Sequence, residues 1–314
     1  MAQAKDKKPS PSYLSLSEAE FEERIEKLYK ILESCALCAR RCGVDRTRGE
    51  VGFCRSGMQP KVSSFFPHFG EEPPLRGTHG SGTIFLSHCN LRCVYCQNWE
   101  ISHLEEGDLL TEEELAQAML HLQRLGCHNI NFVTPTHFAP QLIKAVKLAA
   151  ERGLEIPIVW NCGGYESVEV IRLLEGIVDI YMPDIKYGDE ASARKYSAAP
   201  DYFEVAKEVL REMHRQVGDL ELDERGLAVR GLLIRHLVLP NGLAGSEQVL
   251  KFIAELSPNS YVNIMDQYRP CYRAVDYPEL ARPITQEEYD EVIELALRLG
   301  LHRGFARRRV LFWW

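Results

Sequence analysis

Residues 87–98 read SHCNLRCVYCQN and place three cysteines, Cys89, Cys93 and Cys96, within eight positions. The apolar run at residues 83–86 predicts a short strand, so the cysteines lie on the loop that leaves its carboxyl end. Thiolates are soft ligands that suit iron–sulfur clusters or zinc. Because a cubane cluster has four irons, three local cysteines would leave one iron open to a substrate or a cofactor.

A helix is the alternative setting for the three cysteines, because spacings of four and three residues also describe one face of a helix. They would then be buried apolar residues without a metal. Their polar neighbours argue against this alternative, because they leave no long amphipathic helix around the triplet. These neighbours are Asn90, Arg92, Gln97 and Asn98.

A second cysteine group lies upstream, with the spacing C-x2-C-x3-C-x11-C at Cys35, Cys38, Cys42 and Cys54. Four thiolates can fill every position of a tetrahedral zinc site or of a cubane cluster. We therefore predict a second metal site without an open position, either a structural zinc or an auxiliary [4Fe-4S] cluster. Unligated or redox-active thiols are the alternative.

Composition is typical of a soluble globular protein, with 314 residues, 45% hydrophobic and 26% charged. The chain lacks an apolar run of the ~18 to 20 residues that a membrane span needs, and it starts without a signal peptide. We therefore predict a cytoplasmic protein without membrane contact. The net charge of −8 argues against nucleic acid as a general partner. Seven of ten cysteines fall in the two groups, which favours metal binding in a reducing compartment over disulfides.

From residue 79 onward, short apolar runs alternate with amphipathic segments, the pattern of repeated βα units. Strands are predicted at residues 83–87, 129–134, 157–161, 178–182, 232–239 and 261–265. Helices are predicted at residues 111–125, 140–152, 167–175, 202–215, 246–256 and 286–299. The fold class is therefore α/β, a partial (βα)6 TIM-type barrel.

Four regions are expected along the chain. Residues 1–16 form a disordered tail, and residues 17–78 hold an N-terminal helix, which starts at a capping box of Ser17 and Glu20, and the four-cysteine segment. Residues 79–300 form the barrel. Residues 301–314 form a C-terminal tail, rich in arginine and ending in tryptophan, that either straps the barrel or docks a partner.

The triplet spacing, with Tyr95 just before the last cysteine, resembles the signature of the radical S-adenosylmethionine (SAM) superfamily. Residues 34–300 further resemble proteins related to the pyruvate formate-lyase activating enzyme, in particular the PflX-like group. The stretches that carry this resemblance are CALCARRCGVDRTRGEVGFC, HGSGTIFLSHCNLRCVYCQNWEIS, NINFVTPTHFAPQ, VWNCGGYE, DIYMPDIKY, IRHLVLPNG and NIMDQYRP.

This resemblance implies a radical SAM enzyme of the oxidoreductase or lyase type. Cys89, Cys93 and Cys96 would hold a [4Fe-4S] cluster whose open iron binds SAM. An electron from a reductant such as flavodoxin or ferredoxin would then cleave SAM to a 5'-deoxyadenosyl radical.

Polar residues at the carboxyl ends of barrel strands face the reaction space, so we expect the cofactor contacts there. The expected cofactor-binding residues are Tyr95, Thr134, Thr136, Asn161, Asp184, Lys186, Arg235 and His236. By the resemblance, Asp184, Lys186 and Arg235 match the Asp-x-Lys and Arg positions of activating enzymes. Residues 134–136 stand where the family has Gly-Gly-Glu, but read Thr-Pro-Thr.

The radical would abstract hydrogen from an unassigned small-molecule or peptide substrate. Cys162 and Cys271 are candidates for a thiyl relay, with Tyr268 beside them, although an ordinary buried cysteine is the alternative. By the resemblance, a second possibility is the activation of a partner glycyl-radical enzyme. A third is an iron–sulfur electron carrier or binding module without SAM chemistry, which would leave the polar strand ends unexplained.

Overall fold

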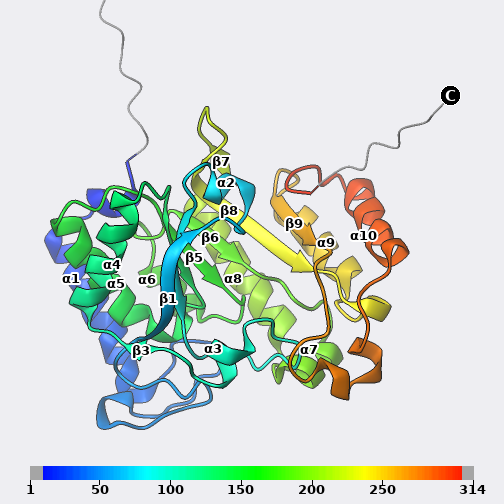
Figure 1. Ribbon diagram of the computed structural model, residues 1–314, viewed down its shortest axis with the longest axis horizontal. Coiled ribbons are helices and arrows are strands. Elements are labelled where there is room, and N and C mark those ends of the chain that lie inside the picture. Colours follow the sequence, from blue (N-terminus) through cyan, green and yellow to red (C-terminus); the bar gives the residue numbers. More distant parts are fainter. Residues whose placement is uncertain (1–9, 306–314) are drawn as a thin grey trace, which may run out of the picture.

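The computed structural model describes residues 10–305, and a mixed sheet of nine strands forms the centre of this part of the chain (Figure 1). The strands follow one another in the order β3-β1-β2-β4-β5-β6-β8-β7, and β9 pairs with β8. Parallel pairing joins β2 (Ser81–Leu86), β4 (Ile130–Val133), β5 (Ile158–Cys162), β6 (Ile180–Pro183), β8 (Ala228–Leu237) and β9 (Tyr261–Met265). Antiparallel pairing adds β1 (Lys61–His68), β3 (Asp108–Leu109) and β7 (Glu221–Leu222).

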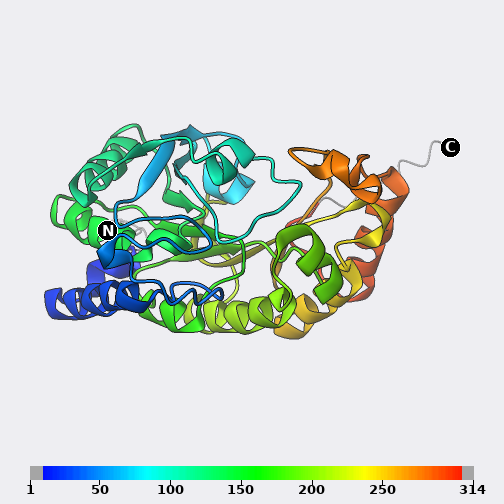
Figure 2. The ribbon, with the colours of Figure 1, turned by 90° about the horizontal axis from the view of Figure 1, so that it is seen from below.

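The six parallel strands are the six predicted ones, and they form an open partial barrel. No pairing between described residues joins β1 to β9, so the curved sheet stays open between its two sides. Helices cover its outer face, and α1 (blue), α8 (yellow-green) and α10 (red) follow the curve in Figure 2. The helices are α1 (Glu18–Lys30), α2 (Pro73–Arg76), α3 (Trp99–His103), α4 (Glu112–Arg124), α5 (Ala139–Glu151), α6 (Val168–Leu173), α7 (Glu190–Ser197), α8 (Tyr202–Val217), α9 (Ser246–Leu256) and α10 (Gln286–Arg298).

Alternation along the strands separates the inside of the barrel from the outside, because successive side chains of a strand point to opposite faces. In β5, Trp160 and Cys162 belong to the large core under the helices. Val159 belongs instead to a small core inside the barrel, together with Ile180 and Leu233. The period of two therefore turns Asn161 inward, toward the space where a ligand would bind.

The structure differs from the sequence predictions in several places, among them α7, which was not predicted. β1 was not predicted, and it joins residues 61–68 to the sheet by pairing with β2. The predicted tail 1–16 reaches too far, because Tyr13 is only 2% exposed and its hydroxyl donates to the Ile156 carbonyl over 3.0 Å. β8 begins at Ala228, four residues earlier than expected.

The predicted C-terminal strap or docking segment lies outside the described residues from position 306 onward. Within residues 10–305, no helix has both the length and the apolar character that crossing a membrane requires.

Candidate active site

The cysteine loop leaves the carboxyl end of β2, as predicted, and runs to α3. His88, the first residue of the turn, has a positive φ of 71°. Each sulfur has a polar neighbour, and the pairs are Leu91 N to Cys89 Sγ (3.3 Å), Ser197 Oγ to Cys93 Sγ (2.9 Å) and Ser102 Oγ with Cys96 Sγ (3.2 Å). Cluster thiolates accept hydrogen bonds of this kind, which tune the cluster.

The donor set of this loop fits an iron–sulfur cluster. All three donors are thiols, and burial raises the pKa of each one, so they are held as apolar groups until a metal binds the thiolate. Among the described residues, no three His, Cys, Asp or Glu side chains are placed to hold a single metal ion. A cubane cluster requires ligands that are farther apart than those around a single ion, because each thiolate binds its own iron.

A charged network lies beside this loop, at the carboxyl ends of β5, β6 and β8. Arg235 donates from its guanidinium to Asp184 Oδ1 and to Asn161 Oδ1, each over 2.8 Å. Lys186 donates from Nζ to the other oxygen of Asp184. Four of the predicted cofactor-binding side chains, Asn161, Asp184, Lys186 and Arg235, are thus brought into one connected group.

The electrostatics of the network keep its members charged. Burial acts to raise the pKa of Asp184, but Arg235 and Lys186 outweigh it and hold that pKa below its ordinary value. Burial acts to lower the pKa of Lys186, but Asp184 outweighs it and holds that pKa above the ordinary lysine value. Tyr187, the residue after Lys186, shares the Ser197 hydroxyl with Cys93 Sγ, so this segment lies beside the cysteine loop.

Two adjacent glutamates extend the network toward the amino-terminal side of the barrel, and the sequence analysis missed both. Glu71 Oε2 accepts from Asn131 Nδ2 over 2.8 Å, and Glu71 Oε1 lies 3.7 Å from the Arg235 guanidinium. Glu72 Oε1 accepts from Asn263 Nδ2 over 2.7 Å. A signal for the two glutamates was present in the sequence. Asn131 and Asn263 lie on strands with their side chains inside the barrel, where they require polar partners in an otherwise apolar layer.

Thr134 and Thr136 follow β4, in the segment that reads Thr-Pro-Thr where the family motif reads Gly-Gly-Glu. Thr134 has a φ of 59°, a left-handed conformation that is uncommon for a β-branched residue. The backbone here therefore keeps a shape that glycine adopts without strain. The Thr136 hydroxyl donates to Glu166 Oε1 over 2.8 Å, and burial raises the pKa of Glu166 to about 7.

The remaining predicted site residues lie outside this network. Cys162 lies in the core under the helices, and His236 uses both ring nitrogens, one with the Ile185 carbonyl and one with the Ser246 hydroxyl. Tyr95 donates to the Tyr187 hydroxyl over 2.7 Å. These three side chains already have structural contacts that account for them.

Tyr268 and Cys271 lie on the segment after β9. The Tyr268 hydroxyl donates to the Leu280 carbonyl over 2.7 Å, and its ring packs edge-on against Tyr95 at 5.9 Å. Cys271 is partly exposed, and its neighbour Tyr272 stacks on Trp99 of α3. This segment therefore packs against the cysteine loop from the far side of the open barrel.

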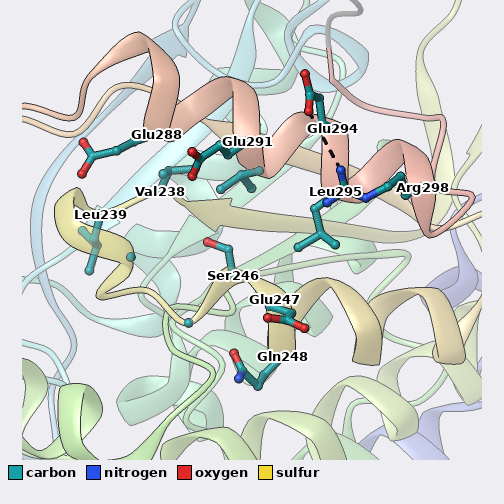
Figure 3. A pocket seen from close by; sticks show the side chains of 13 residues that line it. Val238, Leu239, Ser246, Glu247, Gln248, Glu288, Glu291, Glu294, Leu295 and Arg298 are labelled. Carbon is teal, nitrogen blue, oxygen red and sulfur yellow. Dashed lines mark ion pairs between the residues drawn. The ribbon is translucent and has the colours of Figure 1, made fainter.

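A cavity of about 570 Å³ lies elsewhere, between α9 and α10 (Figure 3). Its acidic side chains include Glu247, Glu288 and Glu294, which pair with Lys251, Arg282 and Arg298, respectively. None of its lining residues belongs to the cysteine loop or to the charged network. The cavity therefore does not coincide with the candidate active site.

Comparison with known proteins agrees with the site. A family model described as the radical SAM superfamily matches residues 83–219, which span β2 to the end of α8. "Uncharacterized protein MJ0674" of Methanocaldococcus jannaschii is 35% identical over 288 residues, covering 88% of this chain and 78% of that protein. "Uncharacterized protein MJ0808" of the same organism is 25% identical over 303 residues, covering 89% and 81%.

A solved structure supports the fold. The crystal structure of HydG, described as a maturase of the [FeFe]-hydrogenase, superposes with a TM-score of 0.50 at 12% identity. The match covers 71% of this chain and 50% of HydG, and at this identity it concerns the fold alone. With the cysteine loop at the carboxyl end of β2 and the family match over the barrel, this chain belongs to the radical SAM superfamily.

Proposed function

We propose that the chain binds SAM between a [4Fe-4S] cluster on Cys89, Cys93 and Cys96 and the charged network, and uses it to abstract hydrogen from a polar substrate inside the barrel. The observation that carries this proposal is the Lys186 ammonium, anchored by Asp184, on a segment whose next residue, Tyr187, shares the Ser197 hydroxyl with Cys93. When bound, the cluster and SAM would supply reductive cleavage to a 5'-deoxyadenosyl radical, with the single electron coming from a donor.

Lys186 is the residue we assign to the SAM carboxylate. An ammonium that stays charged in a dry site forms a strong, charge-assisted hydrogen bond with a carboxylate. Asp184, which Arg235 holds in place, anchors Lys186, while Asn161 offers an amide to the ribose or the carboxylate. The left-handed backbone at Thr134 would present main-chain groups to the SAM amino group, as glycines do in the family motif.

A polar substrate is favoured by the inner layer of the barrel. Asn131, Asn263 and the two glutamates Glu71 and Glu72 supply hydrogen-bonding groups below the charged network. Asn131 Oδ1 is buried without a hydrogen-bond partner among the described residues, so a polar ligand could satisfy it and an apolar ligand would not.

A small substrate is favoured over a loop of a partner enzyme by the segment after β9. It bridges the open side of the barrel at the cysteine loop: Arg273 N donates to the Val94 carbonyl over 2.9 Å, and the Gln97 side chain donates to the Gln267 carbonyl over 3.3 Å. A glycyl-radical partner would have to displace these contacts to insert a glycine. Activation of such a partner is therefore the less supported function.

The test is SAM cleavage by protein reconstituted anaerobically with iron and sulfide and reduced with dithionite. We expect 5'-deoxyadenosine from the wild type and from Cys127→Ala, a buried cysteine outside both groups, but none from Cys93→Ala. Equal yields from Cys93→Ala and from the wild type would refute the proposal.

A further inference from the structure

The four upstream cysteines meet in one small cavity, which also has Arg46 and His137 in its wall. Cys35 and Cys38 are buried, Cys54 is partly exposed and Cys42 is exposed, so the group has an inner and an outer face. The chain closes tightly around it at Gly52, where a β-carbon would lie 2.8 Å from Cys42 Sγ. Only glycine fits at that position without moving the thiol.

His137 provides an independent sign that this cavity takes a ligand. It is 1% exposed, and its Nε2 lies 2.8 Å from the Ser87 carbonyl, so this nitrogen carries the proton. Its Nδ1 is left as a buried acceptor without a hydrogen-bond partner in the described structure, and Arg46 Nε is a buried donor without one. Buried polar atoms are rarely left unpaired in the absence of a ligand or water.

We propose that these four cysteines hold an iron–sulfur cluster that receives single electrons from an acidic carrier protein and passes them to the cysteine loop of the active site. The inference rests on the proposed function, because it concerns how that site is reduced. The carrier loses one electron, and the cluster at Cys89, Cys93 and Cys96 gains it. No covalent bond forms or breaks in this step, and no proton is transferred.

The inner face of the cavity is joined to the active-site loop by one amide side chain. Asn90 follows Cys89 directly, and its Oδ1 lies 4.0 Å from Cys89 Sγ. Asn90 Nδ2 donates to the Tyr165 carbonyl over 2.6 Å, and the next residue, Glu166, forms an isolated antiparallel bridge with Cys38. Asn90 thus links Cys89 to the backbone beside Cys38, which gives a short path for an electron.

Arg40 fixes the two groups relative to each other. Its Nε donates to the Asn90 carbonyl over 3.0 Å, and its guanidinium also donates to the Ser197 carbonyl over 3.2 Å. The Ser197 hydroxyl in turn donates to Cys93 Sγ. The upstream segment is therefore held against both Cys89 and Cys93, with no intervening domain or linker.

The outer face suits an acidic partner. Residues 35–55 contain five arginines and two carboxylates, in a chain whose net charge is −8. Arg41, Arg48 and Arg55 are exposed near Cys42 and Cys54, and each pairs with a carboxylate at 3.2 to 3.3 Å. Exposed pairs of this kind are weak and can exchange partners, so a carrier with clustered carboxylates can dock over the exposed thiol.

The metal at this site is tested in a variant that lacks the active-site ligands, Cys89→Ala/Cys93→Ala/Cys96→Ala. We expect about four irons and four sulfides per chain after reconstitution, with a paramagnetic signal on reduction, as a cubane cluster gives. Zinc without iron, or no metal at all, would overturn the proposal. This result is independent of SAM chemistry, because the variant cannot support it.

Electron entry is tested with the triple variant Arg41→Gln/Arg48→Gln/Arg55→Gln, which keeps all of the cysteines. With reduced flavodoxin as the donor, we expect SAM cleavage to slow at least about tenfold, because rim charges govern the rate of association. With dithionite the rate should stay unchanged. The matched control replaces three exposed arginines elsewhere, at positions 124, 225 and 298, and should leave both rates unchanged.

The flavodoxin and dithionite assays separate a failure of carrier docking from a failure of SAM cleavage. Equal rates for the two variants with flavodoxin would contradict docking at the arginine rim. A complete absence of SAM cleavage with dithionite, in the wild type as well, would instead refute the proposed function. The two failures are therefore distinguishable.

Discussion

The substitution Asp184→Asn tests whether the ion pairs of the charged network contribute to stability. Asp184 is 16% exposed and lies between the Arg235 guanidinium, at 2.8 Å, and the Lys186 ammonium. The asparagine keeps the shape of the side chain but leaves two cations without their shared counter-ion. Removing one partner of a buried ion pair costs about 3 to 5 kcal/mol, since the remaining charge stays desolvated.

The assay is equilibrium unfolding in urea, with Asp276→Asn as the matched control. Asp276 also pairs with an arginine, Arg273, at 2.9 Å, but both side chains are more than half exposed. We expect the free energy of unfolding to fall by about 3 to 5 kcal/mol for Asp184→Asn and to be unchanged for the control. Restoring part of the loss by adding Lys186→Met would show that the excess cation causes it. A loss as small as that of the control would refute a dry, paired network.

Three further predictions follow from individual residues. Lys186→Ala should weaken SAM binding by about 10- to 100-fold in equilibrium dialysis, the loss of one charge-assisted hydrogen bond, while Lys251→Ala, an exposed lysine on α9, should not. Thr134→Gly should leave the free energy of unfolding unchanged or raise it by up to about 1 kcal/mol, because glycine relieves the φ of 59°; a clear loss would contradict this reading. Burial lowers the pKa of His236 to about 4, so the unfolded chain binds more protons, and the stability present above pH 6.5 is lost as the pH falls toward 4. In urea titrations, His236→Gln should lose about 2 kcal/mol less free energy of unfolding than the wild type between pH 6.5 and pH 5. A pH dependence equal to that of the wild type would contradict a buried, neutral His236.

The barrel strands and the cysteine loop were predictable because local signals specify them. Apolar runs bounded by glycine and polar residues identified all six parallel strands, and the triplet spacing placed the thiols at the end of β2. β1 escaped prediction because its exposure is mixed, including the exposed Phe65 and Phe66, so it lacks a buried apolar run. Only Lys61 and Val62 pair with β3, so most of β1 has a neighbouring strand on one side alone, and such strands carry weaker patterns than strands buried on both faces.

The site was only partly predictable, because its partners come together from distant parts of the chain. Asp184 and Lys186 were identified by their local pattern, but their link to Glu71 depends on the packing of α2 against the barrel. Likewise, the sequence showed two cysteine groups but not that Asn90 and Arg40 join them. Nor could the sequence show the contacts of His236, whose ring nitrogens pair with the Ile185 carbonyl and the Ser246 hydroxyl.

Cys89, Cys93 and Cys96 leave one iron of the proposed cluster open, and we propose that SAM binds this iron. Electron paramagnetic resonance of the dithionite-reduced protein, with and without SAM, tests this binding. We expect SAM to change the spectrum of the wild type and to leave that of Cys93→Ala unchanged. A wild-type protein that is fully loaded with iron and whose reduced spectrum does not respond to SAM would contradict it.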